Sequence, residues 1–279
     1  DDKKNGMRLV LGNLDKQSYD SLVMSNFDEI TNQKIKNAYD FFYEKFNEMT
    51  ETEIKEAHDK LMDNFIYVSV TATGHKEAYH LFEAMNNRGL PLSPTDLMKN
   101  YLLMTSSEEE NIDEERIEKI WGDIIMNLDS IKGTRSDPVV LFFRQYFMSS
   151  KYLEINEKIT ENLLYEPTFV EAIKTEDTEK MLEHIRKQSE LYNKMLSQRI
   201  TNFGKNKDIE INKLLKDTKT ISTTPFTLLL RAFEETEYDN LIKIIKMCNS
   251  LLIRRQSCGK STAEHDSFFN HLAQNAFKN

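Results

Sequence analysis

Basic residues form the two clusters in this sequence that could bind a charged ligand. The first consists of Arg254, Arg255 and Lys260, and the second of Arg199, Lys205 and Lys207. The guanidinium group of arginine is planar and forked, which suits the oxygens of a phosphate, so both clusters are candidate contacts to DNA. A structural explanation fits the first cluster as well, because cations in the last turn of a helix complement its dipole and Gly259 can end that helix. The pattern leaves both explanations open.

The charge of the whole chain limits how it could meet nucleic acid. The 279 residues carry a net charge of -9. Proteins that coat DNA usually have a basic excess, because their affinity comes from neutralising phosphates. A local basic patch remains compatible with this balance. DNA bound at such a patch and a second copy of the chain are the candidate partners.

Residue types typical of catalytic and metal sites are present but scattered. Cys248 and Cys258 form no C-x-x-C motif, and no two histidines have H-x-x-x-H spacing. The sequence contains no G-x-G-x-x-G motif, no P-loop and no G-x-S-x-G motif. We therefore assign no catalytic residue, and we expect this chain to bind neither a metal ion nor a cofactor.

Composition predicts the fold class. Glycine (8) and proline (5) are scarce, and 30% of the residues are charged. This balance favours helices, and we expect a mainly α, multi-helix domain with a small β element at about 8–11 and 65–71. No run of about eighteen apolar residues occurs and no signal peptide is recognised, so we expect a cytoplasmic protein with no membrane contact.

Hydrophobic periodicity predicts where the helices and the core lie. Apolar residues recur at helical spacing in segments of the expected helical part, at about 113–129, 138–149, 176–199, 208–216, 225–235, 237–256 and 262–277. Two aromatic stripes share this spacing, and we interpret both as core: Tyr39, Phe42, Tyr43 and Phe46, and Phe142, Phe143, Tyr146 and Phe147. The acidic stretch from Ser106 to Glu115 is the candidate domain boundary.

A polar stretch between two predicted helices holds the remaining candidate residues. Gly89 suits the left-handed end of the helix that begins at Lys76. Ser93-Pro94-Thr95-Asp96 is typical of a helix start, with Ser93 as N-cap and Asp96 as its partner in a capping box. Asn100 lies four residues after Asp96 on the same helix face, at a position that capping does not explain.

The same stretch carries a family resemblance. Residues 82–102, FEAMNNRGLPLSPTDLMKNYL, resemble a hallmark of the GmrSD N-terminal-domain family (domain of unknown function 262). The matching residues are Phe82, Glu83, Asn86, Gly89, Leu92, Asp96, Leu97, Lys99, Asn100, Tyr101 and Leu102. The segments 8–23, 225–233 and 251–273 also resemble this family. By this resemblance residues 1–105 are the C-terminal part of the family domain, and residues 106–279 are a helical domain.

The resemblance implies the function of a larger protein. Family members combine a nucleotide-hydrolysing N-terminal part with a nuclease part of the HNH type, and restrict modified phage DNA in bacteria. The Asp-Gly-Gln-Gln-Arg signature of the first part is not in this sequence. His265 echoes a family Glu-His pair, but no ββα-metal region follows it. We therefore interpret the chain as a fragment that contains neither catalytic end, and we assign His265 no nuclease role.

Two functions from different classes follow from this interpretation. The first is a helical scaffold between the catalytic ends of a modification-dependent (type IV-like) restriction protein, whose nucleotide and divalent metal bind elsewhere in the full-length protein. Asn86, Gly89, Asp96 and Asn100 would then border the nucleotide pocket, unless they only shape the turn and cap the helix. The second is a non-catalytic helical module that binds protein partners and no nucleic acid.

Overall fold

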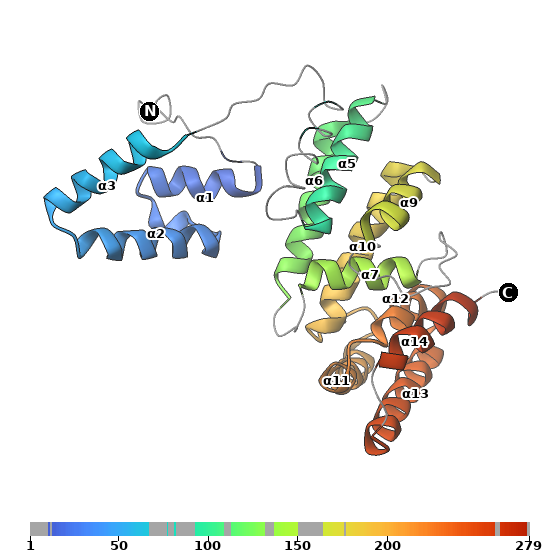
Figure 1. The fold of residues 1–279 in the computed structure, drawn as a ribbon. Coiled ribbons are helices and arrows are strands. Elements are labelled where there is room, and N and C mark those ends of the chain that lie inside the picture. Colours follow the sequence, from blue (N-terminus) through green and yellow to red (C-terminus); the bar gives the residue numbers. More distant parts are fainter. Residues whose placement is uncertain are drawn as a thin grey trace. The chain divides into compact units, whose positions relative to one another are not determined.

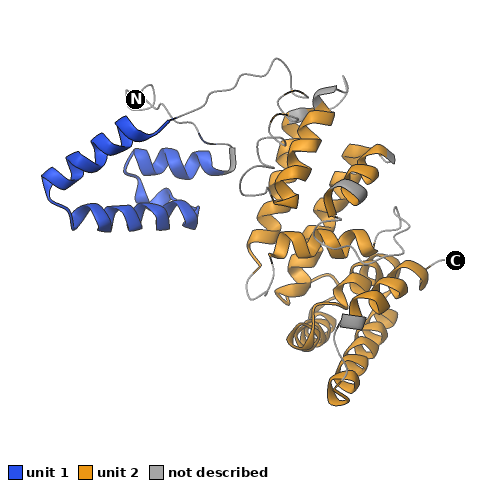
Figure 2. Ribbon diagram, in the orientation of Figure 1, with its two compact units in different colours: residues 1–71 blue, residues 72–279 orange. Residues whose placement is uncertain are grey.

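The chain folds into two compact units in the computed structural model, residues 1–71 and residues 72–279 (Figure 2). The structure describes residues 11, 13–66, 77, 81, 93–108, 113–131, 137–149, 164–175, 177–259 and 263–277. All regular elements in these ranges are helices (Figure 1), which confirms the mainly α fold class.

The expected β element is not found in the part of the chain that the structure describes. Phe65 ends a helix as its C-cap and Ile66 has no regular structure. Residues 8–10 and 67–71, which make up most of the expected strands, lie outside the described residues.

The first unit is built from short helices with side-chain caps. It contains α1 (Asn13–Val23), the 3-10 turn η2 (Phe27–Glu29), α2 (Gln33–Asn47) and α3 (Glu51–Asn64). Asn32 accepts hydrogen bonds from the backbone of Lys34 and Ile35 at the start of α2. Thr50 and Glu53 form a capping box at the start of α3. These caps satisfy backbone N–H groups that a helix start leaves unpaired.

The first aromatic stripe is exposed, so the prediction that it forms core is wrong. Phe42, Tyr43 and Phe46 are 56%, 55% and 46% exposed. Helices α2 and α3 have no buried residue. The rings instead stack along the surface of α2, with the ring centroids of Tyr39 and Tyr43 5.6 Å apart. Helical periodicity shows that one face of a helix is apolar, but it does not show what covers that face.

The second unit contains the large core. Its helices are α5 (Pro94–Glu108), α6 (Glu114–Asp129), α7 (Pro138–Ser149), α9 (Glu171–Thr175), α10 (Thr178–Leu196), α11 (Lys205–Ile221), α12 (Phe226–Glu235), α13 (Tyr238–Ser257) and α14 (Ala263–Asn275), with a π-helical turn η3 (Tyr165–Val170) before α9. Helix α10 packs against α6, α12 packs against α7 and α14, and α11 packs against α13 (Figure 1).

The second aromatic stripe lies in this core, as predicted. Phe142, Phe143, Tyr146 and Phe147 are each at most 2% exposed. Trp121 of α6 stacks on Phe143 with a centroid distance of 5.5 Å. Helix α7 is buried around most of its circumference, which makes it the central helix of the unit.

The position of α5 bears on the expected domain division at residues 105 and 106. Helix α5 packs against α6 and α7, and Met98 and Leu102 belong to the core of the second unit. The compact units divide between Thr71 and Ala72 instead. The division at 105 and 106 follows the family resemblance and stays a prediction.

Candidate functional site

The start of α5 holds the described members of the polar stretch. The hydroxyl of Ser93 donates to Asp96 Oδ2 at 2.7 Å and accepts from the backbone N–H of Asp96 at 3.2 Å. The predicted cap at this helix start is therefore confirmed. Asn100 is half-buried one turn later. Asn86 and Gly89 lie outside the described residues.

The first basic cluster surrounds the end of α13. Arg254 is exposed in the last turn. Arg255 donates from Nε to Nε2 of the buried His265 at 2.9 Å, which connects the end of α13 to α14. Gly259 follows with φ +63°, the left-handed conformation that commonly ends a helix. Lys260 lies outside the described residues.

The second basic cluster lies at the start of α11. Arg199, Lys205 and Lys207 are all exposed. The ammonium group of Lys207 lies 4.5 Å from the ring centroid of Tyr238. Such a cation–π contact holds the lysine stem on the protein surface but leaves its charge accessible.

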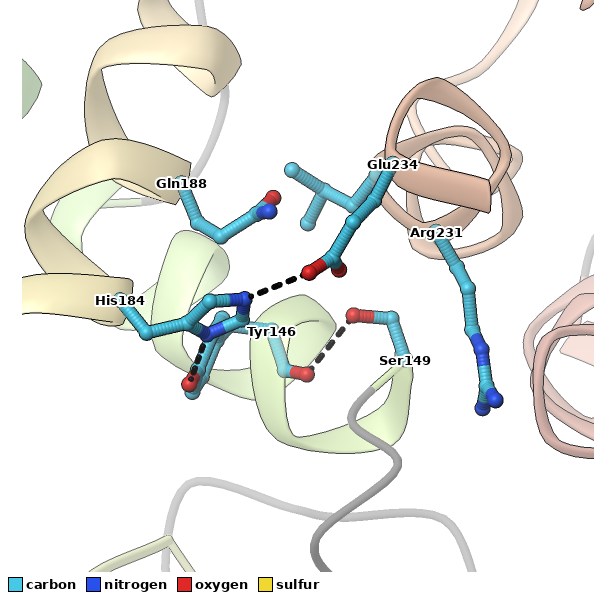
Figure 3. Close-up of a pocket in the computed structure, with 7 residues that line it drawn as sticks. Tyr146, Ser149, His184, Gln188, Arg231 and Glu234 are labelled. Carbon is cyan, nitrogen blue, oxygen red and sulfur yellow. Dashed lines mark hydrogen bonds and ion pairs between the residues drawn. The ribbon is translucent and has the colours of Figure 1, made fainter. Parts of the chain in front are cut away.

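A polar cluster that the sequence did not predict joins three helices of the second unit (Figure 3). His184 of α10 contacts the hydroxyl of Tyr146 of α7 through Nδ1 at 2.8 Å. Its Nε2 contacts Glu234 Oε1 at the end of α12 at 3.1 Å. Ionised glutamate can only accept, so Nε2 must carry a proton. In the neutral imidazole Nδ1 then accepts from the Tyr146 hydroxyl.

A histidine between a carboxylate and a hydroxyl can act as a general base, so the space around it decides its role. The adjoining cavity has a volume of about 10 Å³ and is lined by the cluster together with Ser149, Gln188, Leu230 and Arg231. A cavity of this size holds at most one water molecule, whereas ligand pockets measure roughly 300–1,000 Å³. Tyr146 itself is 2% exposed. The cluster therefore joins helices, and the cavity beside it is too small for a substrate.

Sequence spacing gave no sign of this cluster. Tyr146, His184 and Glu234 come from three helices that are far apart in the chain. His184 has neither a metal-ligand spacing nor a catalytic motif around it. Within the described ranges no group of three His, Cys, Asp or Glu side chains could hold a metal ion.

Comparison with protein families identifies the N-terminal part of the chain. Residues 2–103 match the family model for the N-terminal domain of the GmrSD restriction endonuclease. The resemblance to GmrSD-type restriction proteins is confirmed. No curated protein and no solved structure gives a significant match to the chain. The GmrSD match relates this part of the chain to restriction endonucleases.

The GmrSD match separates the candidate residues into two groups. Asp96 and Asn100 lie inside the matched segment, which ends within α5. The cluster around His184 and both basic clusters lie after it. In the residues that the structure describes, no helix combines the length and the apolar composition needed to cross a membrane.

Proposed function

We propose that this chain is part of a GmrSD-like, modification-dependent (type IV-like) DNA restriction protein of bacterial phage defence. In this protein it is the helical scaffold between a nucleotide-hydrolysing end and a nuclease end. The observation that carries the proposal is the match of residues 2–103 to the GmrSD N-terminal domain. The cavity beside His184 is too small for a substrate, which supports a structural role for the cluster around it. Nucleotide and divalent metal would bind elsewhere in the full-length protein.

Polar bonds between helices of the second unit support a scaffold role. Asn127 of α6 donates to Ser189 of α10 at 3.0 Å. Arg231 of α12 donates to the carbonyl of Ala273 in α14 at 3.2 Å. Gln274 of α14 donates to the carbonyl of Met148 in α7 at 3.1 Å. Buried and part-buried bonds of this kind fix helices relative to one another, so that a displacement at one helix moves its neighbours as well.

A DNA-facing surface on the second unit is a further part of the proposal. From Arg199 to Lys260 the sequence has twelve Lys and Arg residues against seven Asp and Glu residues, whereas the whole chain has a net charge of -9. The exposed side chains of Arg199, Lys205 and Lys207, at and just before the start of α11, form the proposed surface. A basic surface on an acidic protein concentrates its attraction for phosphate in one place.

The polar residues of the GmrSD segment have a place in the same proposal. Asp96 and Asn100, with Asn86 and Gly89, would border the nucleotide pocket of the full-length protein. The Asp96 carboxylate already bonds to Ser93, which fixes its position at the start of α5.

The exposed apolar side chains of α2 and α3 are compatible with self-association of the chain.

Titration of a DNA duplex with the purified chain tests the proposed surface. If two to three phosphates are contacted, affinity should fall about 10- to 40-fold between 50 and 200 mM salt. The double variant Lys205→Glu/Lys207→Glu should weaken binding and flatten the salt dependence. The matched control is Lys34→Glu/Lys36→Glu, which changes the net charge equally at exposed positions of α2.

The alternative function is a protein-interaction module without nucleic-acid binding. The sequence pI of about 5.3 favours it. Under this alternative the chain gives no complex with DNA at 50 mM salt. Equal loss of DNA affinity in the α11 and α2 variants would also contradict a localised DNA surface.

A further inference from the structure

Helices α11 and α13 enclose an open groove that no part of the proposed function uses. Its volume is about 590 Å³, which is within the range of ligand-binding clefts. Leu214 and Ile221 of α11 and Ile253 of α13 give it an apolar lining, and Lys246 and Arg254 of α13 add two cations. Ile253 is 53% exposed, so about half of this apolar residue is in contact with solvent.

Hydrogen bonds hold the two walls of the groove in place. Asn249 of α13 accepts from the Thr218 hydroxyl at 2.6 Å and donates to the carbonyl of Leu214 at 3.0 Å. Near one end of the groove Lys246 donates to Glu210 at 2.8 Å. The bonds from Lys246 and then from Tyr238 hold the pKa of Glu210 below its usual range. The groove is therefore formed before any partner arrives, which lowers the entropy cost of binding.

The charged side chains around the groove favour a negatively charged partner. Of the charged lining residues, Asp217 is acidic, Lys246 is paired with Glu210 of α11, and Arg254 is a cation. Lys213 lies one turn before Asp217 and Lys243 one turn before Lys246, and both are exposed. An acidic partner would meet these lysines and Arg254 along both walls, and complementary charges increase both the rate and the specificity of association.

We propose that the groove between α11 and α13 binds an acidic amphipathic helix of a partner protein. Helix-in-groove recognition places apolar residues at i, i+3 or i+4, and i+7 into an apolar cleft, which fits Leu214, Ile221 and Ile253. The acidic flanks of that helix face Arg254 and the lysines at the rim. DNA fits less well, because its backbone offers no apolar row for the lining residues. This inference stands apart from the DNA-facing surface and does not rest on it.

Fluorescence anisotropy with synthetic peptides tests the groove. The probes are labelled helical peptides of about eighteen residues, with Leu, Ile, Met or Phe at the apolar positions and glutamates on the flanks. A matched set carries lysines in place of the glutamates. We expect acidic peptides to bind the full chain and the lysine set to bind at least about tenfold more weakly.

Two substitutions on α13 locate the binding. Ile253→Glu places a charge in the groove and should weaken the acidic peptides about tenfold or more. Met247→Glu is the matched control, since Met247 is 71% exposed on the same helix and does not line the groove. Because both residues are exposed, both variants should retain the thermal melting of the parent chain. Ile253→Ala, which adds no charge, should weaken binding less but in the same direction.

Several results of these binding experiments would contradict the proposal. The inference is overturned if no acidic peptide of the panel binds up to 1 mM, if the lysine set binds as well, or if Met247→Glu weakens binding as much as Ile253→Glu. Displacement of the bound peptide by duplex DNA would assign the groove to DNA. That result would reject the helix partner and leave the proposed DNA-facing surface standing, so the two proposals fail separately.

Discussion

Replacing Phe142 by alanine is expected to lower the free energy of unfolding of the second unit by about 3–5 kcal/mol. Phe142 is fully buried and lies between Phe143, Tyr146 and Tyr192, at centroid distances of 5.3 to 5.8 Å. Truncation removes these contacts and leaves a cavity that a dense aromatic cluster fills only in part. Urea denaturation followed by the fluorescence of Trp121, the single tryptophan of the chain, measures the loss.

The matched control for this prediction is Phe42→Ala in α2. The sequence pattern treats the two phenylalanines alike, but Phe42 is 56% exposed. Its replacement should change the free energy of unfolding of the first unit by less than about 0.5 kcal/mol, as followed by far-ultraviolet circular dichroism because Trp121 lies in the second unit. A large loss in Phe42→Ala, or a small loss in Phe142→Ala, would show that the assignment of core and surface is wrong.

The second large effect is expected when methionine replaces Gln145. Gln145 is buried in α7, where its Oε1 accepts from the Tyr192 hydroxyl at 2.8 Å and its Nε2 donates to the carbonyl of Thr223 at 2.8 Å. Burial raises the pKa of Tyr192, so the hydroxyl stays protonated and needs an acceptor. Gln145→Met keeps the volume but leaves the Tyr192 hydroxyl without its acceptor, whereas the Thr223 carbonyl keeps the bond from the backbone N–H of Phe226 at 3.1 Å. We expect a loss of about 1–3 kcal/mol.

A double variant separates lost packing from lost hydrogen bonding. Adding Tyr192→Phe to Gln145→Met removes the orphaned hydroxyl and should restore about 1–2 kcal/mol. In the parent chain Tyr192→Phe alone should be destabilising, because it leaves Gln145 Oε1 unpaired. If Tyr192→Phe destabilises both backgrounds equally, the two side chains do not depend on each other and the described bond is not the source of stability.

Local signals predicted the helices because they act within a few residues. The α6 and α7 segments were placed at 113–129 and 138–149 and are observed as Glu114–Asp129 and Pro138–Ser149. Asp113 and Asp137 accept the backbone hydrogen bonds that begin these helices. Helix α11 was predicted too short. It begins at Lys205, directly after Gly204, whose φ of +92° allows the chain to turn into the helix.

Long-range contacts explain what the sequence did not predict. The cover on an apolar helix face comes from other elements, so equal aromatic stripes became a core in α7 and a surface in α2. The cluster of Tyr146, His184 and Glu234 depends on the packing of α7, α10 and α12. The bond between Arg255 and His265 depends on the packing of α13 and α14. Spacing in the sequence carries information about such groups only when they share one helix or one strand.

The capping residues at α5 are the part of the candidate site that sequence reasoning predicted in detail. Ser93 caps the helix as predicted, since a cap involves only neighbours in the chain, and the Asp96 carboxylate accepts from the hydroxyl of Ser93. The sequence identified the residues of the basic clusters but not the side chains that they contact. Arg254 lines the groove of α11 and α13, whereas the adjacent Arg255 bonds to α14.

A cleavage assay with the purified chain tests the proposed scaffold role most directly. The chain is incubated with modified and unmodified DNA, with Mg²⁺ or Mn²⁺, and with each nucleoside triphosphate in turn. We predict that the DNA stays intact and that no triphosphate is hydrolysed above the rate of a buffer control. Metal-dependent cleavage that follows the chain through purification, and that is lost in His184→Ala or His265→Ala variants of unchanged fold, would contradict the scaffold role.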